Sequence, residues 1–201
     1  ATIINFDISS EMLKIALRNR SILSRYNPIL VQGDAARIPI RDGCVDLVFC
    51  NQMLPWVDDL VSCFLEIRRI LKPNGVFIFA TLGPDTMSEI RAAYQPRKIY
   101  SYPDMHDVGD ALVRAGLSDP VLDIDRLKVT FSSAAAFAND LEACGASQNL
   151  SAHKLSLKNC RRNTVSIEVE LVYGHAWGAG QRLKTDEYLL DPTSIGRLKR
   201  P

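Results

Sequence analysis

The chain has 201 residues, of which 47% are hydrophobic and 23% are charged, and its formal net charge is +1. This balance is typical of one soluble globular domain that is long enough to bury a full core. It gives no general signal for nucleic-acid or membrane binding, and no apolar run approaches the ~20 residues of a membrane-spanning helix.

The chain opens with a short apolar strand that ends at Asp7, followed by a predicted helix from Ser10 to Arg20. A second short strand, residues 29–32, leads into the polar motif Gly-Asp-Ala at 33–35. In open parallel sheets, ligands bind outside the carboxyl ends of the strands. Polar residues directly after these strands are therefore candidates for a binding crevice.

Residues 45–80 have the pattern of a strand, a helix and a second strand. The segments 45–50 and 76–80 are almost continuously apolar, as strands covered on both faces should be. Between them, apolar residues of 60–71 recur at helical spacing, and Lys-Pro-Asn-Gly at 72–75 is predicted to stop the helix and turn the chain. This pattern predicts a βαβ unit, with Asn51 and Gln52 after its first strand.

The second half of the chain continues to alternate helices and strands. Thr86, followed three residues later by Glu89, has the pattern of a capping box and predicts a short helix. Further helices are predicted over 105–115 and 134–144, and strands over 120–131 and 165–173. Residues 179–201 are basic and rich in glycine and proline, which predicts a flexible tail.

Several motifs resemble class I S-adenosylmethionine-dependent methyltransferases: GDA at 33–35, VDLVFCN at 45–51 and LKPNGV at 71–76. Longer stretches resemble the malonyl-acyl carrier protein O-methyltransferases of biotin synthesis: LGPDT at 82–86, DMHDVGDALVRAGLSDPVLDIDRL at 104–127 and VELVYGHAWG at 169–178. The resemblance covers residues 1 to about 180. It implies a Rossmann-like α/β fold, with a mostly parallel twisted sheet, helices on both faces and an antiparallel last strand.

The sequence departs from this family at its start, because the family's first strand and Gly-x-Gly-type loop do not precede the strand that ends at Asp7. The resemblance then implies an N-terminally incomplete methyltransferase domain at 1–178, with a substrate-side lid and insertions within 82–163. The missing strand would be the central one, so two strand edges should stay unpaired. We expect such a chain to be deficient in cofactor binding.

The resemblance implies S-adenosylmethionine as cofactor and S-adenosylhomocysteine as product. Asp7 can accept hydrogen bonds from both ribose hydroxyls; alternatively, it stabilises the start of the next helix. Asp34 can meet the adenine amino group, with the Ala35 amide on a ring nitrogen; alternatively, Asp34 closes an Asx-turn. The other predicted cofactor contacts are Ile8, Met12, Asn51 and Gln52, although Met12 also fits a core position.

No catalytic residue is assigned on the substrate side. A sulfonium methyl is already electrophilic and a carboxylate is ionised at pH 7, so alignment and exclusion of water suffice without a general base. The malonyl carboxylate needs a cation or hydrogen-bond donors. Predicted substrate-binding residues are Asp85, Arg91, Tyr100, Tyr102, His106 and His175, with Arg97 and Lys98 as further candidate cations. Alternatively, Asp85 starts a helix, His106 is a surface hydrogen-bond partner and His175 is a buried structural residue.

The predicted partner is an acyl carrier protein with a malonyl thioester, which is acidic as a class and would dock on basic residues. We expect a cytoplasmic monomer that binds neither nucleic acid nor membrane. The five cysteines and three histidines show no metal-site spacing, so we expect reduced core cysteines and no metal.

Three other functions stay open. Related mitochondrial complex I assembly factors share this fold and act as protein arginine hydroxylases or in assembly. The superfamily motifs alone also allow a methyltransferase of another small molecule. The absent glycine loop, taken literally, implies a degenerate domain without catalytic activity.

Overall fold

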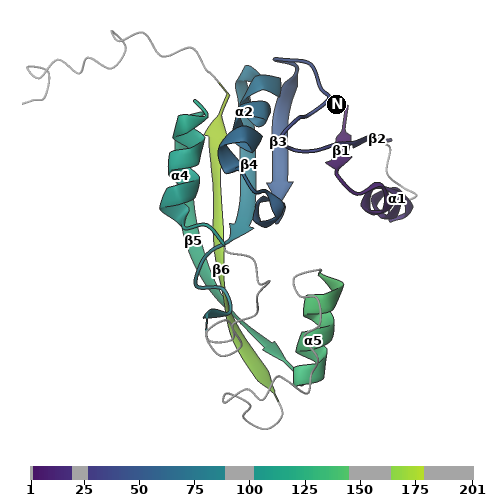
Figure 1. Ribbon diagram of the computed structural model, residues 1–201, viewed down its shortest axis with the longest axis vertical. Helices are drawn as coiled ribbons and strands as arrows, with labels where there is room; N and C mark the ends of the chain where they lie inside the picture. The colour runs from purple at the N-terminus through teal and green to yellow at the C-terminus, as the bar shows by residue number, and fades with distance from the viewer. Residues whose placement is uncertain (1, 20–26, 89–101, 145–163, 179–201) are drawn as a thin grey trace, which may run out of the picture.

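The computed structural model of the chain describes residues 2–19, 27–88, 102–144 and 164–178. Within them, strands and helices alternate in the order of an α/β protein (Figure 1). The elements are β1 (Ile4–Asp7), α1 (Ser10–Arg18), β2 (Ile29–Gln32), β3 (Val45–Asn51), the 3-10 helix η1 (Leu54–Trp56), α2 (Leu60–Ile70), β4 (Leu71–Leu82), α4 (Met105–Arg114), β5 (Ser118–Phe131), α5 (Ala134–Ala143) and β6 (Val165–Trp177).

The predicted elements are present, with differences at their ends. Strand β4 begins at Leu71, before the segment 72–75 that the sequence predicts as a turn. Val45 pairs with Leu71 but Leu47 pairs with Val76, so residues 72–75 bulge out of the β3–β4 ladder. Strand β6 continues past residue 173 to Trp177, because both β4 and β5 pair with it that far.

The strands of the described segments form two separate sheets. One sheet holds β1 and β2 in parallel, and the other has the order β3-β4-β6-β5. β6 is antiparallel to both of its neighbours, which confirms the predicted antiparallel last strand. Figure 1 shows β1 and β2 beside β3, yet no ladder joins the two sheets in the part of the chain that is described. These are the two unpaired edges, on β1 and β3, that the resemblance predicts.

The main core lies between the four-stranded sheet and the helices α2 and α4. The rings of Phe64 and Phe77 lie 5.7 Å apart, and Phe77 stacks on Phe79 at 5.2 Å. Val108 and Leu112 of α4 are fully buried in the same cluster. Since Phe77 and Phe79 alternate with more exposed residues, α2 and α4 cover one face of this sheet.

The opposite face of the four-stranded sheet leaves large apolar side chains exposed. Register places Phe49, Ile78, His175 and Val121 in one row across the four strands. Phe49 is 69% exposed and Val121 is 55% exposed. Within the described residues, α2 and α4 cover one face of this sheet, and α5 packs on the other face over the far ends of β5 and β6, so helices lie on both faces as predicted.

A second, smaller core holds α5 on the far half of the paired strands β5 and β6, at the bottom of Figure 1. Phe137 of α5 is fully buried, and its ring lies 5.1 Å from that of Phe131 on β5. Met87, which follows β4, packs into the same cluster with Ile167 of β6. The segment after β4 thus packs against the paired strands β5 and β6, on which α5 lies.

Candidate functional site

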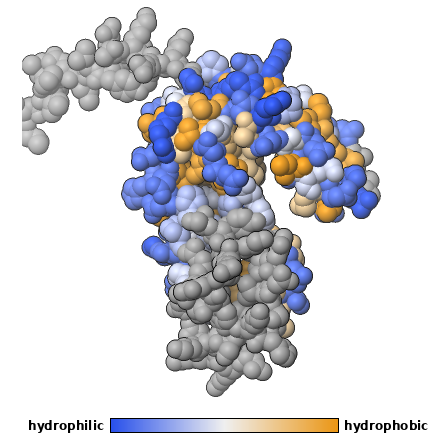
Figure 2. Space-filling view, in the orientation of Figure 1, coloured by the Kyte–Doolittle hydropathy of each residue, from blue (hydrophilic) through white to orange (hydrophobic). Residues whose placement is uncertain are grey.

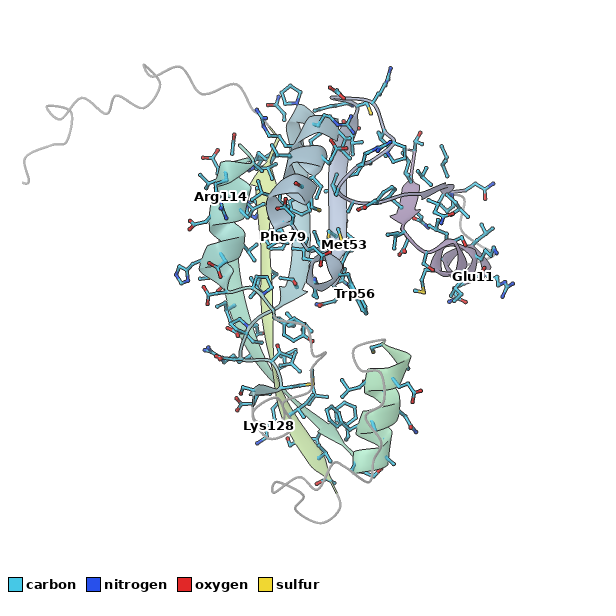
Figure 3. All side chains as sticks on the ribbon, in the orientation of Figure 1. Glu11, Met53, Trp56, Phe79, Arg114 and Lys128 are labelled. Atoms are coloured by element: carbon cyan, nitrogen blue, oxygen red, sulfur yellow. The ribbon has the colours of Figure 1, made fainter. Side chains whose placement is uncertain are left out.

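The candidate site lies at the carboxyl ends of the strands. β1 ends at Asp7, β3 at Asn51 and β4 at Leu82, and the arrowheads of these strands point the same way in Figure 1. Trp56 lies just past the arrowhead of β3 (Figure 3) and is 51% exposed, whereas Leu54 of the same 3-10 helix is 1% exposed. Trp56 therefore lies at the rim of this end of the sheet rather than in its core.

Asp7 shapes the turn from β1 into α1. Its Oδ1 atom accepts a hydrogen bond of 2.7 Å from the Ser9 amide, and the Ser9 hydroxyl in turn caps α1 at Met12. The alternative role of Asp7 at the helix start is thus present in the structure. The same carboxylate keeps its second oxygen without a hydrogen bond among the described residues, so a ligand role is compatible with the turn.

Asp34 follows β2 near the end of β1, because the two strands pair in parallel and Asp7 pairs with Gln32. The Gly33 amide donates to the Asp7 carbonyl at 3.1 Å, which continues the ladder into the loop. Asp34 Oδ1 accepts from the Ala36 amide at 2.9 Å, which is the Asx-turn that the sequence offered as the alternative. A side chain at Gly33 would approach the Phe6 ring to 2.9 Å, so glycine is needed for this close turn.

Two apolar side chains next to Asp7 are open to solvent. Ile8 is 69% exposed and Met12, on the first turn of α1, is 54% exposed. The alternative core role of Met12 is therefore wrong for the described structure. Figure 2 shows such apolar side chains, in orange, on the surface of the unit formed by β1, β2 and α1. They offer an apolar surface beside the two carboxylates.

Gln52 and Thr81 form the most unusual part of the site. The Gln52 amide donates to the Ala80 carbonyl at 2.8 Å, so the backbone of Gln52 lies at the end of β3 next to Ala80 and Thr81 of β4. Gln52 Oε1 and Thr81 Oγ1 are both buried and, within the described structure, both lack a hydrogen-bond partner. Gln52 also has a φ of 56°, which is rare for a residue other than glycine.

These features point to a ligand at this position. A buried polar atom without a partner costs about 1–3 kcal/mol, and backbone strain of this kind gathers at functional sites. The sequence predicts that residues 81–85 lie at the crevice, but it assigns no role to Thr81 itself. The available signal was strand alternation, which places it on the same side as Phe77 and Phe79, but its missing hydrogen bond is visible only in the structure.

Asp85 follows β4 and is held by β5 and β6. Its carboxylate pairs with Arg126 at 3.0 Å, and its amide donates to Glu170 Oε2 at 2.7 Å. Glu170 is 3% exposed, so this loop is fixed by a buried carboxylate. The hydroxyl of Thr86 donates to the Glu170 carbonyl and accepts from the Glu170 amide. Glu89, the predicted capping-box partner of Thr86, lies outside the described residues, so the capping box stays a prediction.

The other predicted substrate residues do not lie together in the described structure. His106 is exposed on the first turn of α4, with its Nδ1 atom 2.7 Å from Asp104 Oδ1. His175 lies within β6, with its ring edge-on to Trp177 at 6.5 Å. Tyr102 is 5% exposed. Arg91, Arg97, Lys98 and Tyr100 lie outside the described residues.

The described cysteines are free thiols, and burial raises the pKa of two of them. Desolvation raises the pKa of Cys50 to about 11 and that of Cys63 to about 12, so both are neutral at pH 7. Within the described ranges, no three His, Cys, Asp or Glu side chains gather as metal ligands would. Among the same residues, no helix is long and apolar enough to cross a lipid bilayer.

The chain was compared with known proteins. Residues 1–79 match the methyltransferase domain family. The chain is 36% identical over 199 residues to a malonyl-[acyl-carrier protein] O-methyltransferase of Methylovorus sp., a match that covers 87% of this chain and 67% of that protein. It is 37% identical over 190 residues to the protein of the same name from Nitrosospira multiformis, covering 86% of this chain and 61% of that protein.

A solved structure shows the fold. The chain is similar to phosphoethanolamine N-methyltransferase 2 of Haemonchus contortus, solved in complex with S-adenosyl-L-methionine, with a TM-score of 0.55 and 18% identity. The match covers 86% of this chain and 42% of that one. At this level of identity the similarity establishes a common fold, and the predicted Rossmann-like methyltransferase fold is confirmed.

Proposed function

The chain belongs to the malonyl-[acyl-carrier protein] O-methyltransferase family, and on this basis we propose that it transfers a methyl group from S-adenosylmethionine to the free carboxylate of a malonyl thioester on an acyl carrier protein. Masking this charge allows fatty-acid synthesis to elongate the chain toward pimelate, an early step of biotin synthesis in the resembled family. The observation that carries the proposal within the structure is the pair of buried polar atoms on Gln52 and Thr81 at the strand ends.

The residues present fit the cofactor. The carboxylates of Asp7 and Asp34 would accept hydrogen bonds from the ribose hydroxyls and the adenine amino group. Ile8 and Met12 supply the apolar surface on which a purine ring packs, since both are exposed beside Asp7. Asn51, Gln52 and Thr81, at the ends of β3 and β4, supply polar groups for the remainder of the cofactor.

Bound S-adenosylmethionine supplies a methyl group on a positively charged sulfur, which needs no further activation. The chain's own residues therefore have to orient the ligands and exclude water. No general base is required, because a malonyl carboxylate is already ionised at neutral pH. Hydrogen bonds to Glu170 and Arg126 hold the loop at Asp85, which follows β4 and borders the substrate side of the site.

The domain boundaries and the setting of the reaction belong to the same proposal. The edges of β1 and β3, which no strand of the described segments pairs, support a methyltransferase domain at 1–178 that is completed by a strand between them, followed by a basic tail at 179–201. The protein acts in the cytoplasm as a monomer, where acyl carrier proteins carry their malonyl groups.

The test is a transfer assay with the full-length protein that carries this chain. We expect radiolabel from methyl-labelled S-adenosylmethionine to enter malonyl-acyl carrier protein as a base-labile ester. Acetyl-acyl carrier protein has no free carboxylate and should stay unlabelled. No transfer to the malonyl form, or equal transfer to both forms, would overturn the proposal. Growth rescue of a strain that lacks the biotin methyltransferase separates it from the assembly-factor alternative.

A matched pair of variants tests the cofactor site. Asp7→Asn should raise the KM for S-adenosylmethionine by about tenfold or more, because hydrogen bonds to a charged group are strong. Asp46→Asn is the control, since Asp46 pairs with Lys72 at 2.5 Å and is 81% exposed. It should leave the KM unchanged. If both variants and the unaltered protein have the same KM for S-adenosylmethionine, Asp7 does not contact the cofactor.

A further inference from the structure

The segment between β2 and β3 links the two sheets. No ladder joins β1 or β2 to the four-stranded sheet among the described residues. The predicted cofactor residues are nevertheless divided between them, with Asp34 after β2 and Asn51 at the end of β3. Their relative placement therefore depends on how the segment 33–44 is held.

Two side chains of α2 hold this segment. Arg69 donates to the Ile38 carbonyl and to the Ile40 carbonyl, each at 2.7 Å, and to Asp42 at 2.5 Å. Glu66 Oε2 accepts from the Ile38 amide at 2.8 Å. Both polar backbone groups of Ile38 are thus bonded to α2.

The two side chains also fix each other. Arg69 Nε donates to Glu66 Oε1 at 2.7 Å, and Arg69 Nη2 donates to Glu66 Oε2 at 2.8 Å. This paired geometry uses the planar fork of arginine, which lysine lacks. The Glu66 side chain is 19% exposed and that of Arg69 is 30% exposed, so solvent competes only in part. The hydrogen bonds from Arg69 hold the pKa of Glu66 below its usual value.

The held residues follow the cofactor loop directly. The Arg37 amide donates to the Asp34 carbonyl at 2.9 Å, which closes a turn that ends just before Ile38. Ile38 is 8% exposed and packs in the main core. A shift of Ile38 is therefore passed to Asp34 through one turn.

We propose that Glu66 and Arg69 are positioning residues that clamp the segment 37–42 to α2 and so set Asp34 of one sheet against Asn51 and Gln52 of the other. The inference rests on the proposed function, because it takes Asp34 as a cofactor contact. Neither side chain touches the cofactor; both act through the loop. The backbone bonds of Gly43 to Arg69 and of Cys44 to Ile70 remain when the side chains change, so the clamp can be loosened without releasing the segment.

A double-mutant cycle in the full-length protein tests the clamp, with the Kd of S-adenosylhomocysteine measured by calorimetry. Arg69→Lys and Asp34→Asn should each weaken binding by about tenfold. The two changes together should cost much less than the product, because a displaced Asp34 has no contact left to lose. Arg69→Lys combined with Asn51→Ala should instead show the full product, since Asn51 belongs to the other sheet.

Steady-state kinetics distinguish an effect on cofactor placement from a general loss of structure. In Arg69→Lys, the KM for S-adenosylmethionine should rise while kcat and the KM for malonyl-acyl carrier protein stay within about twofold. Arg68→Lys is the control: Arg68 is exposed on the same helix, lies against Gly116 and should leave all three values unchanged. Glu66→Gln, which keeps the size of the side chain, should give the same pattern with a smaller change.

The outcomes are distinct. If Asp34→Asn weakens binding and Arg69→Lys does not, or if their effects multiply in full, the clamp has no positioning role and the inference is wrong. If Arg69→Lys fails to fold, the cycle of Glu66→Gln with Asp34→Asn decides by the same criteria. If the unaltered full-length protein does not bind S-adenosylhomocysteine, the proposed function itself is overturned.

Discussion

At the scale of single residues, substitution of Thr81 tests whether its hydroxyl binds a ligand or only packs in the core. Its hydroxyl is buried without a partner in the described structure, whereas the hydroxyl of Thr86, 1% exposed, has two partners on the Glu170 backbone. We expect Thr81→Val to keep or raise the free energy of unfolding, by up to about 1 kcal/mol, because an unpaired buried hydroxyl is removed. The same change should weaken S-adenosylhomocysteine binding by about tenfold.

Thr86→Val is the matched control for this prediction. It should lower the free energy of unfolding by about 1–3 kcal/mol, because it leaves the Glu170 amide without its partner, while the Glu170 carbonyl keeps its hydrogen bond from the Gly83 amide. Urea titration and calorimetry measure both effects. Unchanged ligand affinity in Thr81→Val would show that its hydroxyl has no ligand role.

The sequence predicts the strand-end residues but not all of their surroundings. Asp7 and Asp34 can be placed from their positions after apolar strands, because parallel strands bring their carboxyl ends to one edge. Their hydrogen bonds to Ser9 and Ala36 show that a local turn and a ligand site can use the same carboxylate. The missing partner of Thr81 depends on packing between distant segments, which residue types and spacing do not encode.

At the scale of elements, the pair of Glu66 and Arg69 gives a pH dependence. The pKa of Glu66 is lowered in the folded protein, first by the hydrogen bonds from Arg69, from an ordinary value of 4.5. Because this pKa is lower in the folded chain than in the unfolded chain, ionised Glu66 stabilises the fold at pH values above its pKa in the unfolded chain. This stabilisation is lost as the pH falls through the pKa of Glu66 in the folded chain. The stability difference between the unaltered protein and Glu66→Gln should therefore be full above about pH 5 and shrink at lower pH.

Urea titrations of both proteins between pH 7 and pH 3 measure this difference. Arg68→Lys serves as control and should follow the unaltered protein over the whole range. A stability difference that does not change with pH would mean that Glu66 has the same pKa in the folded and the unfolded chain. The clamp would then contribute nothing through its charge.

Helical and strand periodicity predicts the elements well, and their ends less well. The apolar residues of α2 recur at helical spacing, and Cys63, Phe64, Ile67 and Ile70 are buried as this predicts. The segment 72–75 reads as a turn in isolation, but pairing of Leu71 with Val45 places it as a bulge inside β4. The ends of elements therefore depend on pairing between strands, which is a property of the whole fold.

At the scale of the whole molecule, no ladder joins the two sheets in the described residues, and this bears on whether the 201-residue chain binds the cofactor by itself. In the part of the chain that the structure describes, β1 and β3 each have one edge that pairs with no strand, and Phe49 on β3 is 69% exposed. Strands of parallel sheets are normally covered on both faces, and an uncovered strand edge exposes unpaired backbone groups. A strand between β1 and β3 would satisfy both edges and fix Asp7 and Asn51 relative to each other.

We therefore expect the chain extended upstream through this strand and its glycine loop to bind S-adenosylhomocysteine at least about 100-fold more tightly than the 201-residue chain. Preorganisation is the reason, because the shorter chain has to order the two sheets against each other upon binding. Calorimetric titration of both proteins measures the difference, with circular dichroism to establish that both are folded. If both are folded and neither binds, the assignments of Asp7, Asp34 and Asn51 to the cofactor fail, and a role in assembly without catalysis becomes the better explanation of the fold.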